Sequence, residues 1–247
     1  MVPIVLLRGL LRESGHWRAL IEELRAVDSQ LVIVTPNVAG NGELYEQESP
    51  TRIESMLPQV MSQLPKGCER YHLIAISMGS MLASHWAKAY PEQVASLTLI
   101  NPSFARFSPF WQRINLLALG SILSRRVRGK RAFQEQILNV TYPTHQGDNS
   151  LLNYHLELAS SHPVSLQNAL RQLVAAAKFK GFDTPPNCIT QVIVSSDDQL
   201  VSSECGKAIA NHWGVELKLF ESDAHDLPLA QSRALATHLY GWCLDKR

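Results

Sequence analysis

Long apolar runs are missing from this sequence. No apolar run reaches the roughly 18 residues that are needed to cross a bilayer. The apolar start, MVPIVLLRGL, has no basic leading region, no long apolar stretch and no small-residue cleavage site, so it is expected to form a first strand rather than a signal peptide. The protein is therefore expected to be cytoplasmic, without a transmembrane segment.

Cysteines are few, and neither sign of charge dominates. The four cysteines are widely scattered, with no CxxC pair and no histidine cluster at metal-ligand spacing, so reduced thiols and no metal site are predicted. The 23 basic and 22 acidic residues leave a net charge of +1, which gives no general reason to expect nucleic acid or a membrane surface as partner. Repeats and low-complexity segments are absent as well.

Short apolar runs alternate with longer segments of helical period. Strands are predicted over residues 3–7, 31–36, 71–76, 94–100, 189–196 and 215–220. Helices are predicted over residues 14–27, 49–64, 80–90, 164–179, 203–213 and 229–244. This alternation favours an α/β fold with a mostly parallel central sheet flanked by helices. With 247 residues and 45% hydrophobic content, the chain is expected to form a single domain, residues 1–247.

One segment breaks the alternation. Between Pro102 and Pro163 the pattern is helical or loop-like, without a clear strand. Such an insertion between two strands can fold over the strand ends, where open α/β sheets bind ligands. We therefore expect residues 103–163 to form a helical lid, inserted between core segments 1–102 and 164–247.

A candidate nucleophile lies in the stretch AISMGS. Ser77 follows the predicted strand 71–76, and a serine at a sharp strand-to-helix turn stands clear of the sheet if the residues two before and two after it are small enough to avoid each other. Ala75 and Gly79 meet that need, although Ala75 stands where G-x-S-x-G has glycine. The N–H groups that begin the next helix can stabilise developing negative charge. A plain turn is the alternative interpretation.

The residues that would activate this serine follow in the required order of serine, acid and histidine. Asp198 lies in the loop after the predicted strand 189–196, and His225 lies in the loop before the last helix. Each follows a strand, so the three side chains can converge at one edge of the sheet. His225 would then accept the proton of Ser77, while Asp198 fixes the imidazole tautomer.

At these motifs the chain resembles the α/β-hydrolase family, as a carboxylesterase-like serine hydrolase, over nearly its whole length. The matching pieces are LLRGLLRESGHW, NVAGNGE, AISMGS, SSDDQLV and ESDAHDLP. The resemblance implies Ser77 as nucleophile, His225 as base and Asp198 as acid. SSDDQLV matches the family pattern G-x-x-D-x-x-V with serine in place of glycine, and Asp197 is the second choice for the acid.

The resemblance also implies an oxyanion hole made by the amides of Met78 and, with less support from the motif, Leu10. The chain departs from the family in the first loop, where Arg8 and Gly9 replace the frequent His-Gly pair. Two interpretations of Arg8 stay open. It can attract an anionic substrate group, or it can form an ion pair inside the loop network.

Further side chains are candidates for contacts with a substrate or partner. Aromatic residues that could line an acyl pocket, or pack the core instead, are Trp17, Phe104, Phe107, Phe110 and Trp111. The basic run from Arg125 to Arg131 is either a solvated helix face or a contact for an acidic carrier protein, a coenzyme A phosphate or an anionic lipid. His16 is expected to be an ordinary helical residue, whereas His155 and His162 fall in or beside the lid.

These observations predict a serine hydrolase that cleaves a carboxylic ester or an acyl thioester through an acyl-enzyme on Ser77, without a metal or organic cofactor. Two alternatives remain open. The same triad supports carbon–carbon bond hydrolysis, perhydrolysis or lyase chemistry, and the scaffold can also serve as a non-catalytic binding module.

Overall fold

The computed structural model describes residues 2–145 and 147–244. In this part of the chain one sheet has the strand order β2-β1-β3-β4-β5-β6, and every neighbouring pair is parallel. The strands are β1 (Ile4–Leu7), β2 (Ile33–Val34), β3 (Tyr71–Ile76), β4 (Val94–Ile100), β5 (Ile189–Ser195) and β6 (Glu216–Phe220). The predicted α/β fold, with a parallel central sheet flanked by helices, is confirmed.

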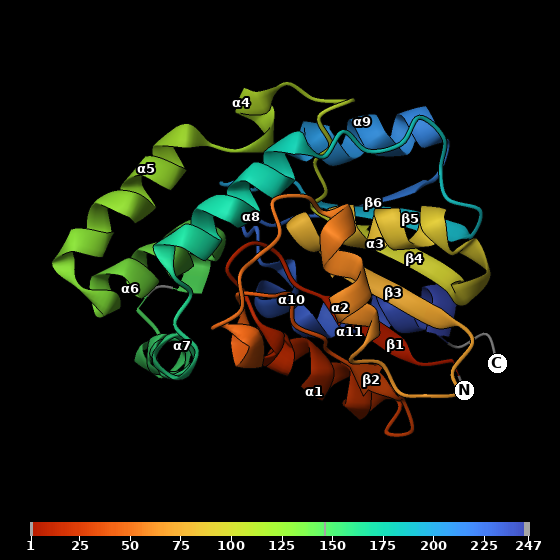
Figure 1. Ribbon diagram of the computed structural model, residues 1–247, viewed down its shortest axis with the longest axis horizontal. Helices are drawn as coiled ribbons and strands as arrows, with labels where there is room; N and C mark the ends of the chain where they lie inside the picture. Colours follow the sequence, from red (N-terminus) through yellow and green to blue (C-terminus); the bar gives the residue numbers. More distant parts are fainter. Residues whose placement is uncertain (1, 146, 245–247) are drawn as a thin grey trace.

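Helices cover both faces of the sheet because successive side chains of a buried strand point to opposite sides. In β1, Ile4 and Leu6 belong to one hydrophobic cluster and Val5 and Leu7 to the other. The first cluster is completed by α1 (Arg18–Val27) and α11 (Ser232–Leu239). The second is completed by α2 (Leu57–Met61), α3 (Met78–Ala89) and α9 (Ser203–Trp213). Figure 1 shows the sheet between these two helical layers.

The segment between β4 and β5 contains helices and loops, and residues 103–145 and 147–163 form no strand. Its helices are α4 (Phe110–Arg113), α5 (Leu116–Arg125), α6 (Lys130–Thr141) and α7 (Asn149–Ser161). In Figure 1, α4 lies at the top, α5, α6 and α7 extend away from the sheet at the left, and α8 (Leu166–Lys178) leads back to the sheet. Whether this segment acts as a lid stays a prediction.

The carboxyl ends of parallel strands meet at one edge of a sheet, so the loops after β1, β3, β5 and β6 come together there.

None of the helices among the described residues is both long enough and apolar enough to span a membrane. Over the same residues, no group of three or more histidine, cysteine, aspartate or glutamate side chains is placed to hold a metal ion.

Candidate active site

Ser77 lies in a strained turn between β3 and α3. Its backbone has φ 57° and ψ −123°, a conformation that costs a non-glycine residue on the order of 1–3 kcal/mol. Hydrogen bonds hold the turn, because the Ser77 amide donates to the Ile100 carbonyl at 2.9 Å and the Ser80 hydroxyl donates to the Ala75 carbonyl at 2.9 Å. The end of β4 therefore fixes the position from which the Ser77 side chain leaves the sheet.

Two glycines allow the loop after β1 to approach this turn closely. A Cβ at Gly79 would meet the backbone carbonyl of Leu7 and would lie 2.6 Å from the carbonyl oxygen of Arg8. A Cβ at Gly9 would lie 2.9 Å from the Cβ of Ser77. The sequence reasoning explained Gly79 by crowding against Ala75, and the structure adds that the atoms nearest to such a Cβ belong to the backbone after β1.

Asp198 and His225 form a buried hydrogen-bonded pair. His225 Nδ1 lies 2.6 Å from Asp198 Oδ2, and the two side chains are 8% and 1% exposed. The second carboxylate oxygen of Asp198 accepts hydrogen bonds from the amides of Leu200 at 2.8 Å and Val201 at 3.0 Å. The carboxylate of Asp197 instead accepts a hydrogen bond from the Ser196 hydroxyl. The structure therefore places Asp198, and not Asp197, beside the imidazole.

Asn101 joins the ends of two strands to the histidine loop. Its backbone has φ 45°, and its side chain donates to the His225 carbonyl at 2.9 Å and accepts from the Ser195 amide at 2.8 Å. The Ser195 hydroxyl in turn donates to the Ala224 carbonyl at 2.7 Å. Sequence reasoning did not single out Asn101. The available signal was a polar residue directly after a predicted apolar strand.

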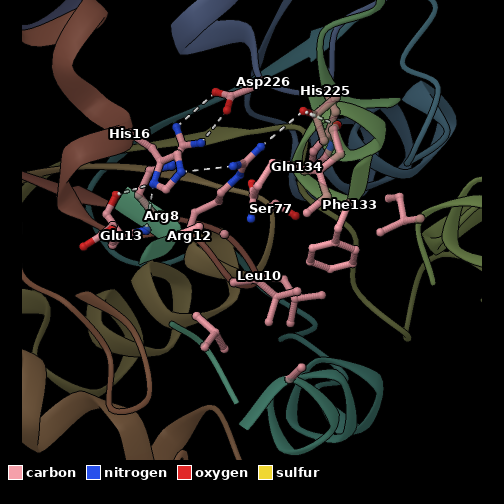
Figure 2. A pocket seen from close by; sticks show the side chains of 18 of the residues that line it. Arg8, Leu10, Arg12, Glu13, His16, Ser77, Phe133, Gln134, His225 and Asp226 are labelled. Atoms are coloured by element: carbon pink, nitrogen blue, oxygen red, sulfur yellow. Dashed lines mark hydrogen bonds and ion pairs between the residues drawn. The ribbon is translucent and has the colours of Figure 1, made fainter. Parts of the chain in front are cut away.

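A cavity of about 440 Å³ lies where these loops meet the helices between β4 and β5. Ser77, His225, Arg8 and Leu10 line it together, as Figure 2 shows. Asp198 contacts His225 from outside this lining. Among the described residues, no hydrogen bond joins the Ser77 hydroxyl to His225. The structure thus brings the predicted nucleophile and base to one cavity, with the predicted acid bonded to the base.

The cavity has two chemically different walls. The core wall is polar and consists of Arg8, Arg12, Glu13, His16 and Asp226. The helical wall is mainly apolar, with Ile114, Leu119, Ile122, Phe133 and Ile137, and Arg126 and Lys130 also reach its lining. In Figure 2 the labelled residues of the core wall lie together, and Phe133 faces them across the cavity. A ligand in this cavity would contact buried charged groups on one side and mainly hydrocarbon on the other.

Arg8 forms a buried ion pair with Asp226. Its two terminal nitrogens donate to the two carboxylate oxygens at 3.0 and 2.5 Å, and the side chains are 6% and 3% exposed. Burial alone would raise the pKa of Asp226, but the charge and hydrogen bonds of Arg8 outweigh it and hold the pKa below its ordinary value. The guanidinium also lies 4.8 Å from the ring centre of Trp17. Of the two interpretations of Arg8, the structure shows the ion pair.

Arg12 is the second buried cation of the core wall. Its Nη1 lies 3.0 Å from His16 Nε2 and 3.3 Å from His155 Nδ1, and its Nη2 donates to the Thr141 hydroxyl at 3.4 Å. Burial lowers the pKa of Arg12 to about 10, which keeps the group charged at neutral pH. Burial and the neighbouring arginine charges also lower the pKa of His155 to about 3 and that of His16 well below its ordinary value. Both histidines are therefore neutral near pH 7.

The predicted pocket aromatics do not line the cavity. Trp17 is fully buried in the core beneath Arg8, and Phe107 packs on a cluster that includes Phe104. Phe110 and Trp111, in α4, are 53% and 72% exposed. Trp17 and Phe107 match the alternative of core packing, whereas the exposed Phe110 and Trp111 match neither interpretation.

The remaining predicted positions lie around the site. Met78 and Leu10 are the residues predicted for the oxyanion hole. The Met78 amide is the first of α3, so no carbonyl of a preceding helical turn accepts its hydrogen. Leu10 lines the cavity. The basic run Arg125–Arg131 is exposed along its length, and Arg126 and Lys130 reach the cavity lining. Sequence reasoning missed the roles of His16 and His155 beside Arg12. The one indication of these roles in the sequence was that His155 falls in the inserted segment.

Comparisons with known proteins identify the family and the fold. The family model described as "alpha/beta hydrolase fold" matches residues 2–195. A curated relative from Escherichia coli O127:H6, named "Putative carbamate hydrolase RutD", is 26% identical over 218 residues, which cover 83% of this chain and 77% of the relative.

Solved structures show the same fold at lower sequence identity. A thermophilic esterase from Thermogutta terrifontis superposes with a TM-score of 0.76 at 18% identity, over 99% of this chain and 90% of the esterase. The enol-lactonase from Burkholderia xenovorans LB400 superposes with a TM-score of 0.77 at 15% identity, over 98% of this chain and 91% of the lactonase. At these identities the likeness shows the fold alone.

Proposed function

Because the chain belongs to the alpha/beta hydrolase fold family, we propose that it is a serine hydrolase that cleaves a carboxylic ester or an acyl thioester through an acyl-enzyme on Ser77. The observation that carries this proposal is the strained turn that presents Ser77 to the cavity that His225 also lines, with His225 bonded to Asp198 at 2.6 Å. A turn without a catalytic role would need neither the strain nor the buried pair.

The mechanism follows from these positions. The Ser77 hydroxyl attacks the substrate carbonyl carbon, and His225 Nε2 takes the hydroxyl proton. Asp198 accepts the Nδ1 hydrogen of the imidazole, which fixes the tautomer and stabilises the imidazolium. The amides of Met78 and Leu10 stabilise the oxyanion. His225 then gives the proton to the leaving alcohol or thiol.

Deacylation uses the same groups in reverse order. His225 takes a proton from water, the hydroxide attacks the acyl-enzyme carbonyl, and the proton returns to Ser77 as the acid leaves. The helices α4 to α7 supply the apolar wall of the cavity, and we propose that they form a lid that excludes bulk water during these steps.

Carbamate hydrolysis is a second candidate, favoured by the printed name of the relatives that match 83% of this chain. A carbamate carbonyl is attacked by the same nucleophile and differs in its nitrogen substituent. The carbon–carbon hydrolase, perhydrolase and lyase alternatives use the same triad, so the substrate and not the nucleophile distinguishes them.

The first test is covalent labelling with a fluorophosphonate, and with phenylmethylsulfonyl fluoride as a smaller probe, followed by intact mass and peptide mapping. Wild type and the control Ser29→Ala, at an exposed serine far from the turn, are expected to gain one adduct on Ser77, whereas Ser77→Ala gains none. Ester hydrolysis by Ser77→Ala should fall about 10⁴-fold or more. A folded wild type that neither probe modifies would overturn the proposal and favour the binding module.

If labelling succeeds, the chemistry is assigned with matched panels of p-nitrophenyl esters, acyl thioesters and aryl carbamates. A higher kcat/KM on the ester and thioester panels supports the first candidate. Turnover confined to carbamates supports the second candidate instead.

A further inference from the structure

Arg12 is a buried cation without a carboxylate partner. Its side chain lines the cavity beside Ser77, and the residue is 9% exposed. Across residues 2–145 and 147–244, no ion pair joins Arg12 to an aspartate or glutamate. Its hydrogen-bonding partners are the side chains of His16, His155 and Thr141.

The charges around Arg12 do not cancel. Arg8 and Asp226 neutralise each other, since both oxygens of Asp226 are bonded to Arg8. The Glu13 carboxylate lies 2.8 Å from His162 Nδ1, and among the described residues it makes no bond to Arg12. Low pKa values keep His16 and His155 neutral. Arg12 is therefore the arginine of the core wall to which, within the described residues, no carboxylate is bonded, although the charge of Asp226 acts on it from its pair with Arg8.

The guanidinium also has hydrogen-bond donors to spare. Arginine carries five N–H donors, and the structure shows Arg12 making two bonds from Nη1 and one from Nη2. Within the described part of the chain, this leaves Nε and the second hydrogen of Nη2 available to a ligand. A carboxylate can accept two such hydrogen bonds side by side.

A purely structural role does not explain the charge. Arg12 links the loop after β1 to α6 through Thr141 and to α7 through His155. Neutral donors can make such links, whereas burying an unpaired cation costs several kcal/mol, about the cost of breaking a buried ion pair. The site retains this cation next to the nucleophile, so an anionic ligand is the missing partner.

We propose that Arg12 binds a carboxylate on the substrate, so that the enzyme acts on esters or thioesters that carry a second, free carboxylate. This inference rests on the proposed function. The substrate would have two ends, with the carboxylate at Arg12 and its hydrocarbon part against the helical wall.

The experiment compares kcat/KM for two matched pairs of esters. In the first pair the acyl group carries the charge, with mono-p-nitrophenyl adipate set against p-nitrophenyl heptanoate. In the second pair the leaving group carries it, with 4-hexanoyloxybenzoate set against 4-hexanoyloxybenzamide. Spontaneous hydrolysis of each ester is subtracted. The readout is the ratio of the anionic to the neutral ester, which cancels general losses of activity.

The wild type is expected to prefer the anionic member of one pair, and that pair shows which side of the scissile bond carries the carboxylate. Arg12→Gln should lower this ratio about tenfold to hundredfold, as expected for a hydrogen bond to a charged group. Arg12→Lys keeps the charge and should retain part of the preference. The control Arg128→Gln removes an exposed cation of the basic run outside the cavity lining and should leave the ratio unchanged.

Two results would overturn this proposal while leaving the proposed function intact. One is a wild-type kcat/KM ratio of anionic to neutral ester near one in both pairs. This result needs no variant, so it overturns the proposal even if the Arg12 variants fail to fold. The other is an equal loss on both members of each pair in Arg12→Gln, which is the signature of a structural role. If wild type hydrolyses none of these esters and Ser77 is not labelled, both proposals fall.

Discussion

The two walls of the cavity are built on different physical principles. In the core wall, charged groups are buried and held by specific bonds, such as the bidentate pair of Arg8 and Asp226. In the helical wall, apolar side chains come from short helices whose outer surface is exposed, for example Leu117 at 86% and Val127 at 90%. A buried charge tolerates little change, because an unpaired partner is costly. Apolar contacts tolerate changes of size more readily.

This difference assigns separate tasks to the two walls. The core wall fixes the position and charge of the groups that we propose to react, since its loops also carry Ser77 and His225. The helical wall shapes the space for the hydrocarbon part of a substrate. Three changes test this division between the two walls, and their expected effects on the free energy of unfolding decrease from the first to the last.

Removing the negative charge of Asp226 should have the largest effect on stability. Asp226→Asn leaves Arg8 buried without its partner, and the free energy of unfolding is expected to fall by about 3–5 kcal/mol in urea denaturation. Asp223→Asn, in the same loop but not buried, is the control and should change it by less than about 0.5 kcal/mol. Equal losses in the two variants would show that the pair does not hold the core wall together.

Acid should destabilise the protein through His155. Burial, with help from the charge of Arg12, lowers its pKa from 6.5 to about 3, so between these values the unfolded chain binds a proton that the folded chain does not. Stability should therefore fall as the pH drops below about 6.5, by up to about 1.4 kcal/mol per pH unit. His155→Asn should reduce this slope between pH 5 and 7, measured by urea denaturation. Identical slopes would contradict the assignment.

Truncating the helical wall should change specificity more than stability. Phe133→Ala removes a half-buried ring and should cost about 1 kcal/mol of stability. It should also lower kcat/KM for p-nitrophenyl octanoate about tenfold relative to p-nitrophenyl acetate. Phe110→Ala, whose ring is 53% exposed and outside the cavity lining, is the matched control. An unchanged preference in Phe133→Ala would remove this residue from the acyl site.

The fold could be predicted because its signals are local. Each predicted strand contains an observed one, although the range 31–36 shrinks to Ile33–Val34 at the edge of the sheet, where both residues are only half-buried. Ser77, Asp198 and His225 could be named because each follows a strand, and parallel strands end at one edge. The bond between Asp198 and His225 agrees with that argument.

The core wall could not be predicted because its contacts join distant parts of the chain. Arg8 and Asp226 are 218 residues apart, and Arg12 and His155 are 143 residues apart. Neither the hydrophobic periodicity nor any short motif of the sequence indicates such long-range pairs. Trp17 shows the opposite problem, since aromatic character suggested a pocket residue, but its position beside Leu20 and Leu24 on the buried face of the first helix decided its packing.

The glycine at position 79 has a consequence for protein engineering. Any side chain there would meet the backbone carbonyls of Leu7 and Arg8, so the nucleophile turn and the loop after β1 cannot be varied independently. A mutant library that randomised these two loops would consist mostly of damaged proteins. A library confined to the helical wall would instead sample new substrate ranges on an intact reaction centre, and directed evolution of this enzyme should begin there.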